Sequence, residues 1–124
     1  GERMKILFMD DDKTTQKVAR EMLKTLSCEV DFASNGSEAV NKYEKATEEG
    51  KYFDIVILDI VIPEGDDGIK TLKKIRQINP KAKVIALTGF ANREIITNYK
   101  KYGFSSAIEK PFTLEKLKTT LNIR

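Results

Sequence analysis

Five polar residues of this 124-residue chain have side chains suited to chemistry, and each follows or ends a short apolar run. They are two adjacent aspartates, a third aspartate, a threonine and a lysine: Asp10, Asp11, Asp59, Thr88 and Lys110. The steps from Asp11 to Asp59, to Thr88 and to Lys110 are 48, 29 and 22 positions, so only the fold can bring these side chains together. If they meet, three carboxylates, one hydroxyl and one ammonium share a single site.

A cluster of three carboxylates requires a cation. Two carboxylates about 5 Å apart repel each other by about 3 kcal/mol at an effective dielectric of about 20. An all-oxygen site with few protein ligands suits Mg²⁺, which keeps several waters and binds beside a phosphate. Asp59 is then best placed as the nucleophile, because an aspartate can form an acyl phosphate. Mg²⁺, Lys110 and the Thr88 hydroxyl would stabilise charge on the phosphoryl oxygens.

The composition excludes several other kinds of site. The chain has no histidine, which excludes a Ser-His or Cys-His nucleophile, an imidazole base and His-ligated zinc. Cys28 is the single cysteine, cannot pair internally and is interpreted as a small core residue. The net charge is +3, and the basic residues are interleaved with acidic residues. This distribution indicates a solvated surface rather than a nucleic-acid-binding patch. No apolar run is long enough for a membrane span, so we expect a cytoplasmic domain without membrane contact.

The apolar pattern predicts the elements that must position the five polar residues. Nearly continuous apolar runs indicate five buried strands, at 4–9, 29–33, 54–59, 83–88 and 105–109. Apolar residues at helical spacing follow each strand, and the fourth helix is expected to end near Gly103. This alternation predicts an α/β fold of the (βα)₅ type, with helices on both faces of a parallel sheet. Ligands of such sheets bind at the carboxyl ends of the strands, where the polar residues lie.

Taken singly, several residues have simpler explanations. Asp12 is interpreted mainly as a helix cap or turn residue. Thr88 alone is typical of a strand end, and Lys110 alone is typical of a surface. Tyr99 and Tyr102 are interpreted as core or rim packing, with a partner surface as the alternative. Only the shared edge of the sheet favours a common site.

The same residues resemble a known family, the receiver domain of two-component response regulators, over essentially the whole chain. The matching segments occur in the family's order, at 6–12, 54–59 with Pro63 and Gly68, 84–89 and 108–112. The resemblance implies a flavodoxin-like three-layer sandwich with strand order 2-1-3-4-5. It places the domain at 4–124 and leaves residues 1–3 as a remnant, which fits excision from a larger protein. The longer loop before Gly68, Ala107 and the Tyr-Gly-Phe stretch at 102–104 look similar to receivers at the C-terminus of hybrid sensor kinases.

The resemblance also implies a function. Asp59 would accept a phosphoryl group from a phosphohistidine of a sensor histidine kinase or histidine phosphotransfer domain, which agrees with the absence of histidine here. Mg²⁺ would be bound by Asp11, Asp59 and the backbone carbonyl of Val61, with Asp10 acting largely through water. A receiver of this kind catalyses its own phosphorylation and dephosphorylation and is not an enzyme with a separate substrate.

Further roles follow from the family pattern. Thr88 would move toward the phosphoryl group, Lys110 would pair with it, and the Lys110-Pro111 peptide would be cis. Gly89, Ala107 and Pro111 are assigned to the conformational response. Family members usually carry an aromatic residue where this chain has Ala107, so the usual threonine-aromatic switch stays open.

The residues beside the path of attacking water predict the lifetime of the phosphoryl group. Val61 and Phe90 follow Asp59 and Thr88 by two positions, and both are apolar. We therefore expect slow self-dephosphorylation.

Three other functions compete with this interpretation. A flavin-binding electron-transfer protein needs a glycine- and hydroxyl-rich phosphate loop after the first strand, whereas the aspartates at 10–12 would repel a phosphate without a metal. A Mg²⁺-dependent phosphatase with an aspartyl intermediate needs a substrate cap, and the sequence has no such insertion. A degenerate receiver that only docks partners would not need to retain the five polar residues.

Overall fold

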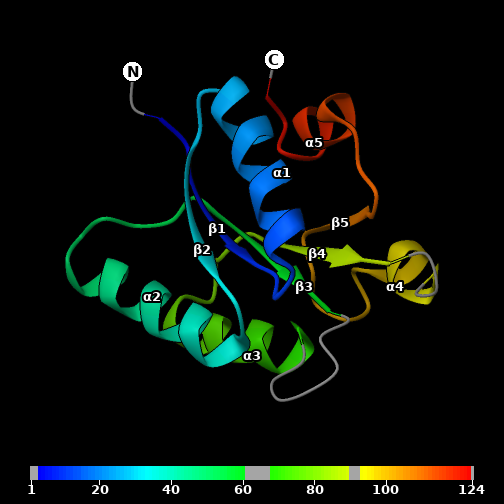
Figure 1. The fold of residues 1–124 in the computed structure, drawn as a ribbon. Coiled ribbons are helices and arrows are strands. Elements are labelled where there is room, and N and C mark those ends of the chain that lie inside the picture. The colour runs from blue at the N-terminus through cyan, green and yellow to red at the C-terminus, as the bar shows by residue number, and fades with distance from the viewer. Residues whose placement is uncertain (1–2, 61–67, 90–92, 124) are drawn as a thin grey trace.

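The computed structural model describes residues 3–60, 68–89 and 93–123, and it has a parallel sheet between two layers of helices (Figure 1). The strands are β1 (Lys5–Met9), β2 (Glu29–Ala33), β3 (Ile55–Asp59), β4 (Val84–Thr88) and β5 (Ser106–Glu109). The helices are α1 (Lys13–Thr25), α2 (Gly36–Glu48), α3 (Gly68–Ile78), α4 (Arg93–Asn98) and α5 (Leu114–Thr120). The strand order is β2-β1-β3-β4-β5, which confirms the predicted flavodoxin-like topology.

Successive side chains of the strands enter two different apolar cores. Ile6 and Phe8 of β1 belong to the core beneath α1 and α5, whereas Leu7 and Met9 belong to the core beneath α2, α3 and α4. This alternation is the two-residue period of a strand whose two faces are both covered. Burying a side chain such as Phe8, which is 0% exposed, contributes about 1.5–3 kcal/mol. The apolar runs of the sequence are therefore explained by a sheet with no solvent-facing side.

Side-chain capping fixes where α1 and α2 begin. Asp12 caps α1, because its side chain accepts a hydrogen bond from the Thr14 backbone N–H. The Thr15 hydroxyl donates to Asp12 Oδ2 at 2.8 Å, and these hydrogen bonds lower the pKa of Asp12. Asn35 caps α2 in the same way by accepting from the Glu38 backbone N–H. The capping interpretation of Asp12 is thus confirmed.

The fourth helix is shorter than the sequence predicts. α4 ends at Asn98, and the expected continuation to Gly103 is wrong. Turns follow instead, in which the Tyr102 N–H donates to the Tyr99 carbonyl and the Gly103 N–H donates to the Lys100 carbonyl. Hydrogen bonds over three residues keep the two tyrosines on the same side, so apolar spacing cannot distinguish these turns from a helix. Both tyrosines are partly buried against the core beneath α2, α3 and α4, as expected for packing residues.

The remaining expectations concern the lone cysteine and the membrane. Cys28 is buried with 7% exposure, which confirms it as a core residue, and burial raises the pKa of its thiol. Within the described ranges, none of the helices combines the length and apolar character needed to cross a bilayer.

Candidate functional site

The alternation of the strands brings three charged side chains to one face of the sheet. Asp10 follows β1, Asp59 ends β3 and Lys110 follows β5, and each is two positions beyond a residue of the core beneath α1 and α5. The Asp10 N–H donates to Ala33 of β2 at 2.9 Å, and the Lys110 N–H donates to Thr88 of β4 at 2.7 Å. These backbone bonds extend the ladder past the strand ends. The three side chains therefore lie at the carboxyl edge of the sheet, on the face that α1 and α5 cover.

Lys110 connects the two buried carboxylates. Its Nζ lies 2.8 Å from Asp10 Oδ2 and 3.0 Å from Asp59 Oδ2. Asp10 is 0% exposed and Asp59 is 2% exposed, so the ammonium replaces much of the water that these groups lose on folding. Asp10 Oδ2 contacts the Lys110 ammonium and has no further partner that meets hydrogen-bond criteria among the described residues. A carboxylate oxygen has two lone pairs, so this buried oxygen can contact a second cation as well.

Burial and charge act against each other at this site. Burial raises the pKa of Asp10, Asp59 raises it further, and Lys110 opposes both effects. Burial by itself lowers the pKa of Lys110, but the two carboxylates outweigh it and leave that pKa above its ordinary value. The ammonium is therefore charged at neutral pH, and the ionised Asp10 carboxylate is held in unfavourable surroundings.

The geometry fits a divalent cation with oxygen ligands. One carboxylate oxygen from each of Asp10, Asp11 and Asp59 lies within 4.8 Å of the other two. Asp11 is exposed, which leaves one side of the cluster open to solvent and to a water-coordinated ion. Three carboxylates and the Lys110 ammonium leave two negative charges, which one divalent cation would neutralise.

Thr88 and its neighbours lie beside this cluster with different orientations. Thr88 is buried at the end of β4, and its hydroxyl donates to the Gly89 carbonyl at 3.3 Å. By the alternation of β4 it belongs to the face that bears Ala86, opposite to Asp59. Ala107 is half-buried against the same core. The structure thus places Thr88 at the predicted edge but gives its hydroxyl a backbone partner.

The structure tests the predicted cis peptide but not the roles predicted for Val61 and Phe90. The Lys110-Pro111 peptide is cis, as expected. Val61, Pro63 and Phe90 lie outside the described residues, so the roles predicted for them stay predictions.

Gly68 allows α3 to begin close to the end of β3. A β-carbon at this position would collide with the side chain of Ile60, which directly follows Asp59, and would lie 3.0 Å from the Ile60 Cα. A glycine is therefore required by the close approach of the two backbones. Gly89 differs, since a β-carbon there would meet nothing within 4 Å.

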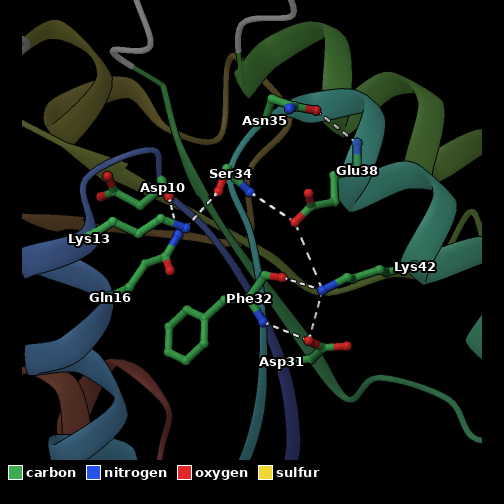
Figure 2. Close-up of polar contacts among 9 residues, drawn as sticks. All are labelled: Asp10, Lys13, Gln16, Asp31, Phe32, Ser34, Asn35, Glu38 and Lys42. Carbon is green, nitrogen blue, oxygen red and sulfur yellow. Dashed lines mark hydrogen bonds and ion pairs between the residues drawn. The ribbon is translucent and has the colours of Figure 1, made fainter.

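Sequence reasoning missed Gln16. Its side chain is buried on α1, and its Nε2 donates to the Asp10 carbonyl at 2.6 Å (Figure 2). The signal was present, because Gln16 stands three positions before Ala19 and seven before Leu23, on the apolar face of the helix. A polar residue on such a face needs a partner, and the partner is the loop that carries Asp10 and Asp11.

Comparison with known proteins assigns the class of this domain. Residues 6–122 match the family model of the response regulator receiver domain, and the chain therefore belongs to this family. It is a receiver domain of two-component systems, which favours that function over the flavin-binding and phosphatase alternatives.

Particular relatives show the range of proteins that contain similar domains. Chemotaxis protein CheY of Bacillus subtilis is 32% identical over 123 residues, covering 95% of this chain and 98% of CheY. Transcription factor SKN7 of Chaetomium thermophilum is 34% identical over 117 residues, covering 94% of this chain but only 15% of SKN7. The crystal structure of CheY4 from Vibrio cholerae is 28% identical, covers 98% of both chains and superposes with a TM-score of 0.84.

Proposed function

We propose that Asp59 accepts a phosphoryl group from a phosphohistidine of a sensor histidine kinase or histidine phosphotransfer domain. The phosphorylated domain then either passes the phosphoryl group on or binds its partners differently. The observation that supports this role is the position of Asp59, a nearly buried carboxylate paired with Lys110 and grouped with two further carboxylates. An aspartate so placed is a carboxylate nucleophile with a fixed cation at one oxygen.

The transfer itself forms one bond and breaks another. A carboxylate oxygen of Asp59 forms the new bond to phosphorus, the phosphorus–nitrogen bond of the donor breaks, and the donor imidazole keeps the electron pair and takes up a proton. Lys110, which is already 3.0 Å from Asp59, would pair with a phosphoryl oxygen. The Thr88 hydroxyl would turn from the Gly89 carbonyl to donate to another.

A magnesium ion belongs to this proposal. Asp10, Asp11 and Asp59 would hold it, with the Val61 carbonyl as a further ligand implied by the family. When bound, Mg²⁺ would offset the negative charge of the carboxylates and of the phosphoryl oxygens. The receiver domain of sensor histidine kinase PA1611 from Pseudomonas aeruginosa has a magnesium ion coordinated in its active-site cleft, and it is 26% identical with a TM-score of 0.82.

The setting and lifetime of the phosphorylated state complete the proposal. The osmosensing histidine kinase SLN1 of Saccharomyces cerevisiae matches over 95% of this chain but 10% of its own length, which supports a role as one domain of a longer signalling protein. We propose that this domain acts in the cytoplasm. Apolar Val61 and Phe90 would limit the access of water, so self-catalysed dephosphorylation would be slow. A phosphoryl half-life of seconds in Mg²⁺ would contradict this part.

Incubation with acetyl phosphate and Mg²⁺, followed by intact mass measurement, tests the acceptor. The wild-type chain should gain one phosphoryl group, and Asp59→Asn should gain none. Asp54→Asn is the matched control, because Asp54 precedes the other end of β3 and is exposed. An unchanged gain in Asp59→Asn would exclude Asp59 as the acceptor.

A further inference from the structure

We propose that Gln16 is a positioning residue for the cation site and acts by fixing the peptide group that joins Asp10 to Asp11. The inference rests on the proposed function, since it concerns the cation that Asp10, Asp11 and Asp59 would hold. Gln16 itself touches none of the three carboxylate groups in a described hydrogen bond; its contact is with the backbone.

The contact is short and buried. Gln16 is 6% exposed, and its Nε2 donates to the Asp10 carbonyl oxygen at 2.6 Å (Figure 2). That carbonyl belongs to the peptide unit whose other end is the nitrogen of Asp11. Because a peptide unit is planar, a hydrogen bond to its oxygen limits rotation of the whole unit. The orientation of the Asp11 backbone is therefore set in part by the Gln16 amide.

The remaining polar atoms of Asp10 are held by other groups. Its N–H donates to the Ala33 carbonyl at 2.9 Å, and its Oδ1 accepts from the Asp12 N–H at 2.9 Å. Asp10 is thus fixed at its nitrogen, its carbonyl and its side chain. Asp11 is exposed, so packing does not hold its side chain, and the direction of its backbone decides where its carboxylate can reach.

The base of the Gln16 side chain is also fixed. The Gln16 N–H donates to the Asp12 carbonyl at 3.0 Å in the first turn of α1, directly after the cap. Ala19 and Leu23 are buried on the same face of this helix. The amide therefore links a rigid helix to the loop that carries both aspartates, and it gives a hydrogen-bond donor to the carbonyl of the buried residue Asp10.

Magnesium affinity, measured by titration calorimetry without any phosphoryl donor, tests this role. Gln16→Met keeps the length and packing of the side chain but removes its donor, and it should weaken Mg²⁺ binding about tenfold. Leu23→Val is the matched control, because it changes a buried residue of the same helix away from the loop, and its Mg²⁺ affinity should equal that of the wild type. Circular dichroism identifies a temperature at which all the chains are folded.

The outcomes separate this inference from the proposed function. Equal Mg²⁺ affinities of wild type and Gln16→Met would overturn the positioning role alone, and so would an equal loss in Leu23→Val. A wild-type chain that binds no Mg²⁺ would overturn both proposals. If Gln16→Met does not fold, Gln16→Asn takes its place, since its amide is one methylene too short to reach the Asp10 carbonyl, and the same comparisons decide.

Discussion

At the carboxyl ends of the strands Lys110 pairs with two buried carboxylates, whereas at the amino ends the charged groups lie near water. There, exposed Asp54 accepts a hydrogen bond from the Lys5 backbone N–H at 2.8 Å, and Lys5 Nζ donates to the Lys51 carbonyl at 3.1 Å. A hydrogen bond of this kind, between the backbone and a charged side chain near water, contributes about 1 kcal/mol. Buried charges need partners and lower stability when a partner is missing. The comparison indicates that the carboxyl edge is arranged for chemistry at the expense of stability.

Replacing the lysine at each end of the strands should produce the largest difference in the free energy of unfolding. Lys110→Met leaves Asp10 and Asp59 buried without their ammonium, and we expect it to lower the free energy of unfolding by about 3 kcal/mol at neutral pH. Lys5→Met should change it by less than about 1 kcal/mol. Chemical denaturation of both variants checks the difference, and equal losses would remove the distinction between the two ends.

Two glycines at the carboxyl edge of the sheet test whether backbone packing there, as well as charge, affects stability. Gly68→Ala should destabilise the fold by about 2 kcal/mol, because its β-carbon collides with Ile60 beside Asp59. Gly89→Ala meets open space and should change stability by less than about 0.5 kcal/mol. Thermal unfolding distinguishes them. A Gly68→Ala chain as stable as the wild type would show that α3 can move away from β3 freely.

Asp10→Asn should be stabilising, by about 1 kcal/mol at neutral pH, because it removes a carboxylate whose burial is unfavourable while Asp59 remains paired with Lys110. Burial raises the pKa of Asp10 in the folded chain above its ordinary value of 3.8. The favourable contribution of the protonated group is then complete below the unfolded pKa and is lost as the pH rises through the folded pKa. The gap between the variant and the wild type should therefore widen from acid to neutral pH.

Denaturation curves at several pH values measure that gap. Asp54→Asn is the control at the amino end, where replacing an exposed carboxylate should change stability by less than about 0.5 kcal/mol. An Asp10→Asn chain that is less stable than the wild type at neutral pH would contradict the idea that the ionised carboxylate is held unfavourably.

Much of this edge could be predicted from the sequence because strands and helices have fixed periods. The apolar run before Asp59 reads as a strand covered on both faces, and parallel strands place their carboxyl ends together. Asp10, Asp59 and Lys110 each stand two positions after an apolar residue that faces α1 and α5. Their convergence therefore follows from strand order and alternation, without knowledge of any distance.

Other features of the site depend on distances between side-chain atoms, which the spacing of residues along the sequence does not determine. The bridge from Lys110 to both carboxylates requires the two ion-pair distances, and the hydrogen bond from the Thr88 hydroxyl to Gly89 requires a side-chain rotation. The end of α4 at Asn98 was missed because turns preserve apolar spacing. Gln16 was missed because a single polar residue on an apolar helix face does not reveal which carbonyl it meets.

The ammonium of Lys110 acts as an internal counter-ion, within 3.0 Å of both Asp10 and Asp59. Because this ammonium already offsets the repulsion between the Asp10 and Asp59 carboxylates, we expect the domain to fold without a bound metal. Under the proposed function, the magnesium concentration would then control whether Asp59 can be phosphorylated. The fold would be the same at low and at high magnesium concentration.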